Sequence, residues 1–261
     1  MPECHYLPFI DRSKPIIISY VLIYGINAVA EALKAGRVAA LRVSTRADDR
    51  MRAVLRLAQE RGVTIRRVDT VELDRAAPGA SHQGVVADVT TGREYDIAGL
   101  VREATPPALL VVLDGIEDPH NFGAIVRTAD AAGAHGVIRQ TRRAAPLGTA
   151  AGKASAGAIA HMKIADVVNI ARALEELKEA GVWTVGLAGD APADYDKVDL
   201  TLPTALVLGA EGTGLRRLVR ERCDFLVKIP MLGHIGSLNV SVAAGVALFE
   251  AVRQRRASNR A

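Results

Sequence analysis

The 261-residue sequence lacks most of the features that mark specialised classes of protein. Aromatic residues make up only 4% of it, so aliphatic side chains must fill the core. Its two cysteines, Cys4 and Cys223, lie far apart without zinc-ligand or disulfide-framework spacing, which indicates a reducing, cytoplasmic compartment. No His, Cys and carboxylate cluster has metal-ligand spacing, so we expect no metal requirement.

Long hydrophobic runs are also missing. The longest candidate, residues 15–24, is too short to span a bilayer, so we expect no membrane association. A signal peptide is the weaker alternative, because no small-residue cleavage site follows this run.

Neither sign of charge dominates the sequence. The 33 basic and 29 acidic residues give a net charge of +4, which excludes a histone-like polycation but not an anionic partner. The basic residues are 26 Arg and 7 Lys, and Arg binds phosphate through a bidentate fork. This excess of Arg over Lys suits a protein that binds nucleic acid, although the codon usage of a GC-rich genome is the stronger explanation for the excess.

The pattern of apolar residues divides the chain into four parts. Residues 1–20 form a leader without periodicity, and a translation start at Val21 would leave it out of the protein. Residues 21–90 predict a small βα domain, with helices at 25–33 and 48–61 and strands at 38–43, 63–68 and 85–89. Residues 91–107 are polar around one helical segment at 97–103, which is typical of a linker.

Residues 108–261 predict a second, larger α/β domain. Strands are expected at 109–113, 136–139, 182–187, 205–208 and 225–229, and helices at 121–133, 167–180, 215–222 and 237–256. This alternation indicates a parallel sheet with helices on both faces. Ligands bind such sheets at the carboxyl ends of the strands, which directs attention to the loops after Leu113, Leu208 and Ile229.

The first of these loops contains Asn121, a good candidate for the N-cap of the next helix, and Arg127. Arg127 lies among small and apolar residues, so its guanidinium must meet an anion or solvent. An ion pair with Asp130 or Asp114 is an equally good interpretation.

The second loop contains the glycines Gly209, Gly212 and Gly214, whose spacing differs from that of a dinucleotide fingerprint. The Glu211 carboxylate would repel a pyrophosphate but suits a ligand with a cationic centre and no phosphate, such as S-adenosylmethionine. A plain turn with a solvated Glu is the alternative.

The third loop leads into the last helix. We expect Ser237 to cap this helix, with Asn239 in its first turn and a buried stripe of Leu238, Val242, Gly245 and Phe249. A second apolar surface, formed by Val240, Ala243, Ala244, Ala247 and Ala251, predicts a homodimer contact unless it packs inside one subunit.

Three motifs carry a resemblance to a known family. They are N-F-G-A-I-x-R-T-A at 121–129, L-G-x-E-G-x-G at 208–214 and I-P-M…S-L-N-V-S-V-A between 229 and 243. Together they resemble the SpoU (TrmH) family of RNA ribose 2′-O-methyltransferases within the SPOUT superfamily. The segments Y-G-I-N-A-V-x-E-A-L and H-Q-G-V-V-A resemble the ribosomal-protein-like RNA-binding domain of the subgroup that methylates a guanosine of 23S ribosomal RNA. Asn27 departs from the His that is commoner in that subgroup.

The resemblance implies a deep trefoil knot in the C-terminal domain, a homodimer, and S-adenosylmethionine as methyl donor. It implies that Gly209, Ile229 and Leu238 contact the cofactor, and that Asn121, Arg127, Glu211, Ser237 and Asn239 line the reaction site. Arg127 could act as the base or as a clamp on the substrate phosphate. We prefer the clamp, because a guanidinium has a pKa above about 12.

Several alternatives stay open. The RNA could be a tRNA or an antibiotic-resistance target, and a non-catalytic ribosome-assembly factor could keep the same fold. The cluster Arg139, Arg142 and Arg143 suits a phosphate contact, but a solvated surface run is an equal interpretation.

Overall fold

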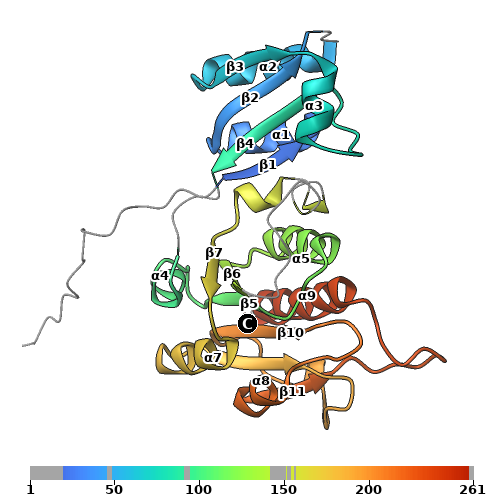
Figure 1. Ribbon diagram of the computed structural model, residues 1–261. Helices are drawn as coiled ribbons and strands as arrows, with labels where there is room; N and C mark the ends of the chain where they lie inside the picture. The colour runs from blue at the N-terminus through green and yellow to red at the C-terminus, as the bar shows by residue number, and fades with distance from the viewer. Residues whose placement is uncertain are drawn as a thin grey trace, which may run out of the picture.

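The computed structural model describes residues 20–45, 49–90, 95–141, 151, 154–155 and 157–258, which fold around two separate sheets (Figure 1). The smaller sheet has the strand order β1-β4-β2-β3, and the larger has the order β7-β6-β5-β10-β8-β11-β9. In these ranges no helix combines the length and apolar character needed to cross a membrane. Most of the leader, residues 1–19, lies outside the described residues, as do Arg142 and Arg143.

The smaller sheet forms the N-terminal unit. Its elements are β1 (Tyr20–Tyr24), α1 (Ile26–Lys34), β2 (Val38–Ser44), α2 (Asp49–Glu60), β3 (Thr64–Val68), α3 (Thr70–Ala76) and β4 (Val85–Thr90). Helices α1 and α2 cover one face, and α3 packs on the other through Leu73. Helix α3 was not predicted from the sequence, because its apolar stripe is too short to stand out; its N-cap is Asp69.

The larger sheet is parallel throughout. Its elements are β5 (Leu109–Asp114), α5 (Pro119–Ala131), β6 (Gly136–Gln140), η1 (Ala158–Ala160), β7 (Ile164–Val167), α7 (Ile170–Glu179), β8 (Trp183–Leu187), β9 (Ala193–Asp194), η2 (Tyr195–Lys197), β10 (Thr204–Gly209), α8 (Arg217–Arg222), β11 (Phe225–Lys228) and α9 (Val240–Ser258). The predicted α/β class with a parallel sheet is therefore confirmed. The trefoil knot stays a prediction.

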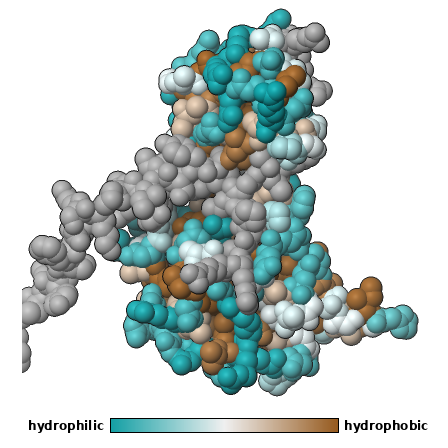
Figure 2. Space-filling view, viewed as in Figure 1, coloured by the Kyte–Doolittle hydropathy of each residue, from teal (hydrophilic) through white to brown (hydrophobic). Residues whose placement is uncertain are grey.

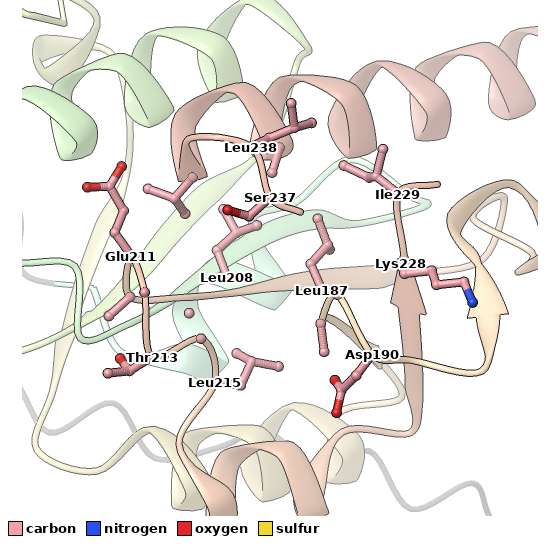
Figure 3. A pocket seen from close by; sticks show the side chains of 18 of the residues that line it. Leu187, Asp190, Leu208, Glu211, Thr213, Leu215, Lys228, Ile229, Ser237 and Leu238 are labelled. Atoms are coloured by element: carbon pink, nitrogen blue, oxygen red, sulfur yellow. The ribbon is translucent and has the colours of Figure 1, made fainter. Parts of the chain in front are cut away.

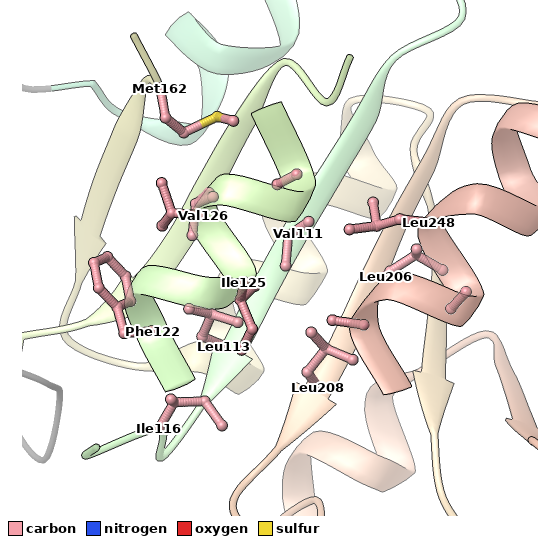
Figure 4. Close-up of a cluster of buried hydrophobic side chains, with 14 of the residues drawn as sticks. Val111, Leu113, Ile116, Phe122, Ile125, Val126, Met162, Leu206, Leu208 and Leu248 are labelled. Atoms are coloured by element: carbon pink, nitrogen blue, oxygen red, sulfur yellow. The ribbon is translucent and has the colours of Figure 1, made fainter. Parts of the chain in front are cut away.

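Helices cover both faces of the larger sheet. Every residue of β5 is buried. Alternate residues such as Val111 and Leu113 pack against α5 and α9 (Figure 4), while Leu110 and Val112 pack against the helices of the opposite face. This two-sided burial explains why the strands read as continuous apolar runs in the sequence.

A helix inside the predicted linker belongs to this second core. In α4 (Ile97–Arg102), Ile97 and Leu100 are buried in the same cluster as Leu110 and Val112. The Leu100 side chain lies so close to Gly136 that a Cβ there would be 2.8 Å from it. The segment therefore stabilises the larger sheet, which a free linker would not do.

The buried face of α9 differs from the predicted stripe, of which only Gly245 faces another helix. Val242 and Phe249, expected in the buried stripe, are 51% and 50% exposed, and Leu238 precedes the helix. The buried face consists instead of Val240, Ala244, Ala247, Leu248, Glu250 and Ala251. Most of the surface expected to form a dimer thus packs inside one subunit. Small side chains allow α9 to approach α5, so that a Cβ on Gly245 would lie 3.6 Å from Thr128.

The segment between β11 and α9 projects from the molecule (Figure 1). Apolar side chains gather on it in the space-filling view (Figure 2), and the most exposed of them are Leu232, at 98%, and Ile235, at 72%.

Candidate active site

Two of the three predicted ligand loops, those after Leu208 and Ile229, line a cavity of about 650 Å³ at the carboxyl edge of the larger sheet (Figure 3). The loop after β8 lines it as well, whereas the loop after Leu113 does not. The ends of β8, β10 and β11 and the start of α9 form its walls. Gly209, Ile229 and Leu238, the predicted cofactor contacts, all line it. Glu211, Ser237 and Asn239 from the predicted reaction site line the same cavity.

The loop after β10 folds back tightly onto the end of its own strand. The Gly214 amide donates a 2.8 Å hydrogen bond to the Ala210 carbonyl, and Gly212 and Gly214 have positive φ angles of 78° and 67°. A Cβ on Gly209 would overlap the backbone of Gly214 and Leu215. Glycine is therefore required at Gly209 by close approach, and at the two others by conformation.

A buried carboxylate anchors this loop to the neighbouring strand. Asp114, at the end of β5, is fully buried and accepts hydrogen bonds from the Arg216 amide at 2.8 Å and from Arg216 Nε at 2.6 Å. Arg216 also donates to Gln140 Oε1 at 2.6 Å. Arg216 was not predicted from the sequence, although an Asp that ends a buried strand and an Arg that begins a helix were both visible.

Three polar side chains meet beside the cavity. Asn239 Nδ2 donates to Asn121 Oδ1 at 3.0 Å and to Glu211 Oε1 at 2.5 Å. Asn239 Oδ1 accepts hydrogen bonds from the Ser241 amide and hydroxyl, which fixes the direction of its amide group. The trio formed by Asn121, Glu211 and Asn239 thus joins α5, the loop after β10 and the start of α9.

Two predicted helix caps are wrong. Asp118 caps α5 by accepting a hydrogen bond from the His120 amide at 2.9 Å, and Asn121 lies inside the helix. Helix α9 begins at Val240, so Asn239 rather than Ser237 occupies its cap position. Neither Asn121 nor Ser237 therefore serves as a helix cap. Asn121 binds Asn239, and Ser237 lines the cavity.

Arg127 is exposed on α5 and does not belong to the trio. Within the described ranges no hydrogen bond or ion pair holds it, and Asp114 is paired with Arg216 instead. In the described residues Arg127 therefore forms no ion pair with Asp130 or Asp114, the two partners considered from the sequence. Its guanidinium can reach an anion.

Arg139 has internal partners. Its Nε lies 2.7 Å from Asp166, its guanidinium lies 5.3 Å from the centre of the Phe122 ring, and its side chain is only 12% exposed. Arg139 is therefore not part of a solvated surface run, and a phosphate contact by it stays a prediction.

The lining of the cavity fits S-adenosylmethionine better than a phosphate-containing cofactor. Its cationic side chains are Arg220 and Lys228, and Arg220 is paired with Asp190 at 2.7 Å. The hydrogen bond from Arg220 lowers the pKa of the Asp190 carboxyl. The Asp190 charge is balanced by Arg220, so Glu211 supplies the negative charge for a cationic ligand, while Leu187, Leu208 and other apolar side chains cover its uncharged parts. No group of His, Cys and carboxylate side chains within the described ranges could hold a metal ion.

Comparisons with known proteins agree with this geometry. The SpoU rRNA methylase family matches residues 108–249, and the RNA 2′-O ribose methyltransferase substrate-binding family matches residues 22–95. The chain is 46% identical over 241 residues to the 23S rRNA (guanosine-2′-O-)-methyltransferase RlmB of Photobacterium profundum, which covers 90% of this chain and 98% of the relative. It is 45% identical to the putative TrmH family tRNA/rRNA methyltransferase YacO of Bacillus subtilis, over 89% of this chain and 95% of the relative.

A solved structure is also similar over almost the whole chain. The SpoU methyltransferase AviRb from Streptomyces viridochromogenes, in complex with the cofactor AdoMet, has a TM-score of 0.77 and 29% identity and covers 91% of each chain. The fold, the three motifs and these relatives lead to one conclusion: the chain belongs to the SpoU rRNA methylase family.

Proposed function

We propose that this protein transfers a methyl group from S-adenosylmethionine to the 2′-hydroxyl of a guanosine ribose in 23S ribosomal RNA. The observation that carries the proposal is the hydrogen-bonded trio, which places the Glu211 carboxylate at the rim of the cavity. The relative named for this reaction is similar over nearly its entire length, which supports the choice of RNA.

S-adenosylmethionine, when bound, supplies an already activated methyl group, so the protein must align the ribose and help to remove its proton. Asn239 holds one carboxylate oxygen of Glu211, which leaves the other free to accept a hydrogen bond from a ribose hydroxyl. Such alignment contributes up to ~7–11 kcal/mol, and assistance with the proton ~10²–10⁴-fold. Ser237 lines the cavity and can orient the same ribose.

Arg127 has a different role in this proposal. Its exposure and its freedom from partners in the described ranges suit a clamp on the substrate phosphate, which also stabilises charge developing on the ribose oxygen. A guanidinium is a poor base because of its high pKa.

We infer that residues 21–90 deliver the RNA and that two copies of the chain form a homodimer. The dimer contact is the exposed side of α9, where Phe249, Val252, Arg253, Arg256 and Ala257 line a groove of about 420 Å³. Val242 extends this surface toward the projecting apolar segment before α9. Exposed apolar surface of this kind is typical of a protein contact. Action on ribosomal RNA would place the enzyme in the cytoplasm.

The test is to map 2′-O-methyl nucleotides across total rRNA and tRNA in cells with and without this protein, and in cells that carry Arg127→Ala. Loss of one guanosine mark in 23S rRNA, restored by the wild type but not by Arg127→Ala, supports the proposal. A lost tRNA mark would indicate a tRNA enzyme, and a lost mark elsewhere in rRNA would indicate another target such as a resistance site. Unchanged maps would favour the non-catalytic assembly factor.

A further inference from the structure

A second cavity lies on the other side of the trio. It has a volume of about 340 Å³ and is lined by the loop Gly115–Asp118 together with Asn121, Ala210, Glu211 and Val240. Ala210, Glu211 and Val240 line the larger cavity as well, so the two spaces meet at these residues. A ribose held at the trio between them would have the methyl donor on one side and its own base on the other.

The lining of this second cavity does not suit phosphate. It contains no basic residue, whereas its hydrogen-bond acceptors are the carboxylates of Glu117, Asp118 and Glu211 and the amide oxygen of Asn121, which already accepts from Asn239. Ile116 and Val240 add apolar surface on which the plane of a base can pack. The cavity therefore suits a ring that carries no negative charge and presents hydrogen-bond donors.

Of these acceptors, Glu117 is the one without a partner in the described part of the chain. Asp118 Oδ1 accepts from the His120 amide, and Asn121 Oδ1 and Glu211 Oε1 accept from Asn239. Glu117 is exposed at the mouth of the cavity. Both of its carboxylate oxygens are thus free to accept hydrogen bonds from a ligand.

We propose that the second cavity holds the base of the acceptor nucleotide and that Glu117 selects guanine. Guanine presents two adjacent donors, N1–H and the N2 amino group, on its Watson–Crick edge, which match the two oxygens of a carboxylate. Adenine and cytosine place a ring-nitrogen lone pair beside their amino group, and uracil flanks its single N–H with two carbonyls, so each would repel the carboxylate. This inference rests on the proposed function and names the residue that sets its base specificity.

The test uses the full-length enzyme and an RNA fragment that contains the methylated site, with either guanosine or inosine at that position. Inosine lacks only the N2 amino group. We expect the wild type to prefer guanosine by kcat/KM, and Glu117→Gln to reduce this preference by about 5- to 150-fold, the range for a bidentate contact to a base. Binding of the demethylated cofactor product should be unchanged in the variant. Glu179→Gln, which removes the same charge from the exposed end of α7, is the control and should keep the wild-type preference.

The outcomes separate this inference from the proposed function. If the wild type methylates guanosine and Glu117→Gln keeps the wild-type preference, the role of Glu117 is wrong while the proposed function stands. If the wild type methylates no guanosine ribose, the proposed function fails and this inference fails with it. If Glu117→Gln is too slow for its kcat/KM values to be compared, the affinities of the guanosine and inosine RNAs are measured in the presence of the demethylated product. A ratio of these two affinities equal to that of the wild type overturns the inference.

Discussion

Gly209→Ala should abolish most of the affinity for the cofactor without unfolding the protein. The added Cβ would lie less than 3.0 Å from backbone atoms of both Gly214 and Leu215, a separation that real Cβ atoms essentially never show. Overpacking costs ~1–3 kcal/mol, and we expect the upper end because backbone rather than a flexible side chain must move. If this cost falls on the cofactor loop, about 3 kcal/mol corresponds to about 150-fold in affinity.

The assay is calorimetric titration of the purified variant with S-adenosylmethionine or its demethylated product. Gly233→Ala is the matched control, because it adds the same methyl group in a neighbouring loop where no atom lies within 4 Å of the new Cβ. Circular dichroism checks that both variants keep the native fold. A folded Gly209→Ala protein that binds the cofactor as tightly as the wild type would refute the assignment of this loop as the cofactor site.

Three further outcomes follow from the packing. A truncated protein that begins at Tyr95 should fold and bind the cofactor, whereas one that begins at Pro106 loses the buried helix α4 and should be less stable to urea by ~2–5 kcal/mol or more. Burial lowers the pKa of His135, whose Nδ1 accepts a hydrogen bond from the Leu109 amide. The wild type should therefore lose stability as the pH falls below about 6.5. Melting curves of His135→Gln should show a weaker loss over the same pH range. Phe249→Glu should convert the proposed dimer to monomers in light scattering at micromolar concentration, and a monomeric wild type would contradict the dimer itself.

The sign of the His135 effect follows from proton uptake. Because the folded state has the lower pKa, the unfolded state binds more protons between the two pKa values. Stability contributed by the neutral ring is therefore present above the unfolded pKa of about 6.5 and is lost as pH falls toward the folded pKa.

The parallel sheet could be predicted from the sequence because β5, β6, β8 and β10 are short apolar runs bounded by glycines and polar turns. Element boundaries and buried faces were predicted wrongly where the local pattern of apolar residues differs from the tertiary packing. Residues 167–169 were assigned to the start of a helix, but Val167 ends the edge strand β7 and Asn169 caps α7. In α9, apolar residues occur on nearly every side, so periodicity could not tell which face would pack against α5.

The loops that line the candidate site could be predicted from the sequence, but the grouping of their side chains could not. Parallel strands place their following loops on one edge, and this rule alone directs attention to the loops with Asn121, Glu211 and Asn239. Which loops become neighbours depends on the strand order, and β10 lies directly beside β5 although β6, β7, β8 and β9 come between them along the chain. That pairing brings Glu211 next to α5 and allows one amide, Asn239 Nδ2, to bind both Glu211 and Asn121. Residues that follow β10 also line both cavities, so the proposed base selection by Glu117 and the proposed methyl transfer beside Glu211 depend on a strand order that no local motif encodes.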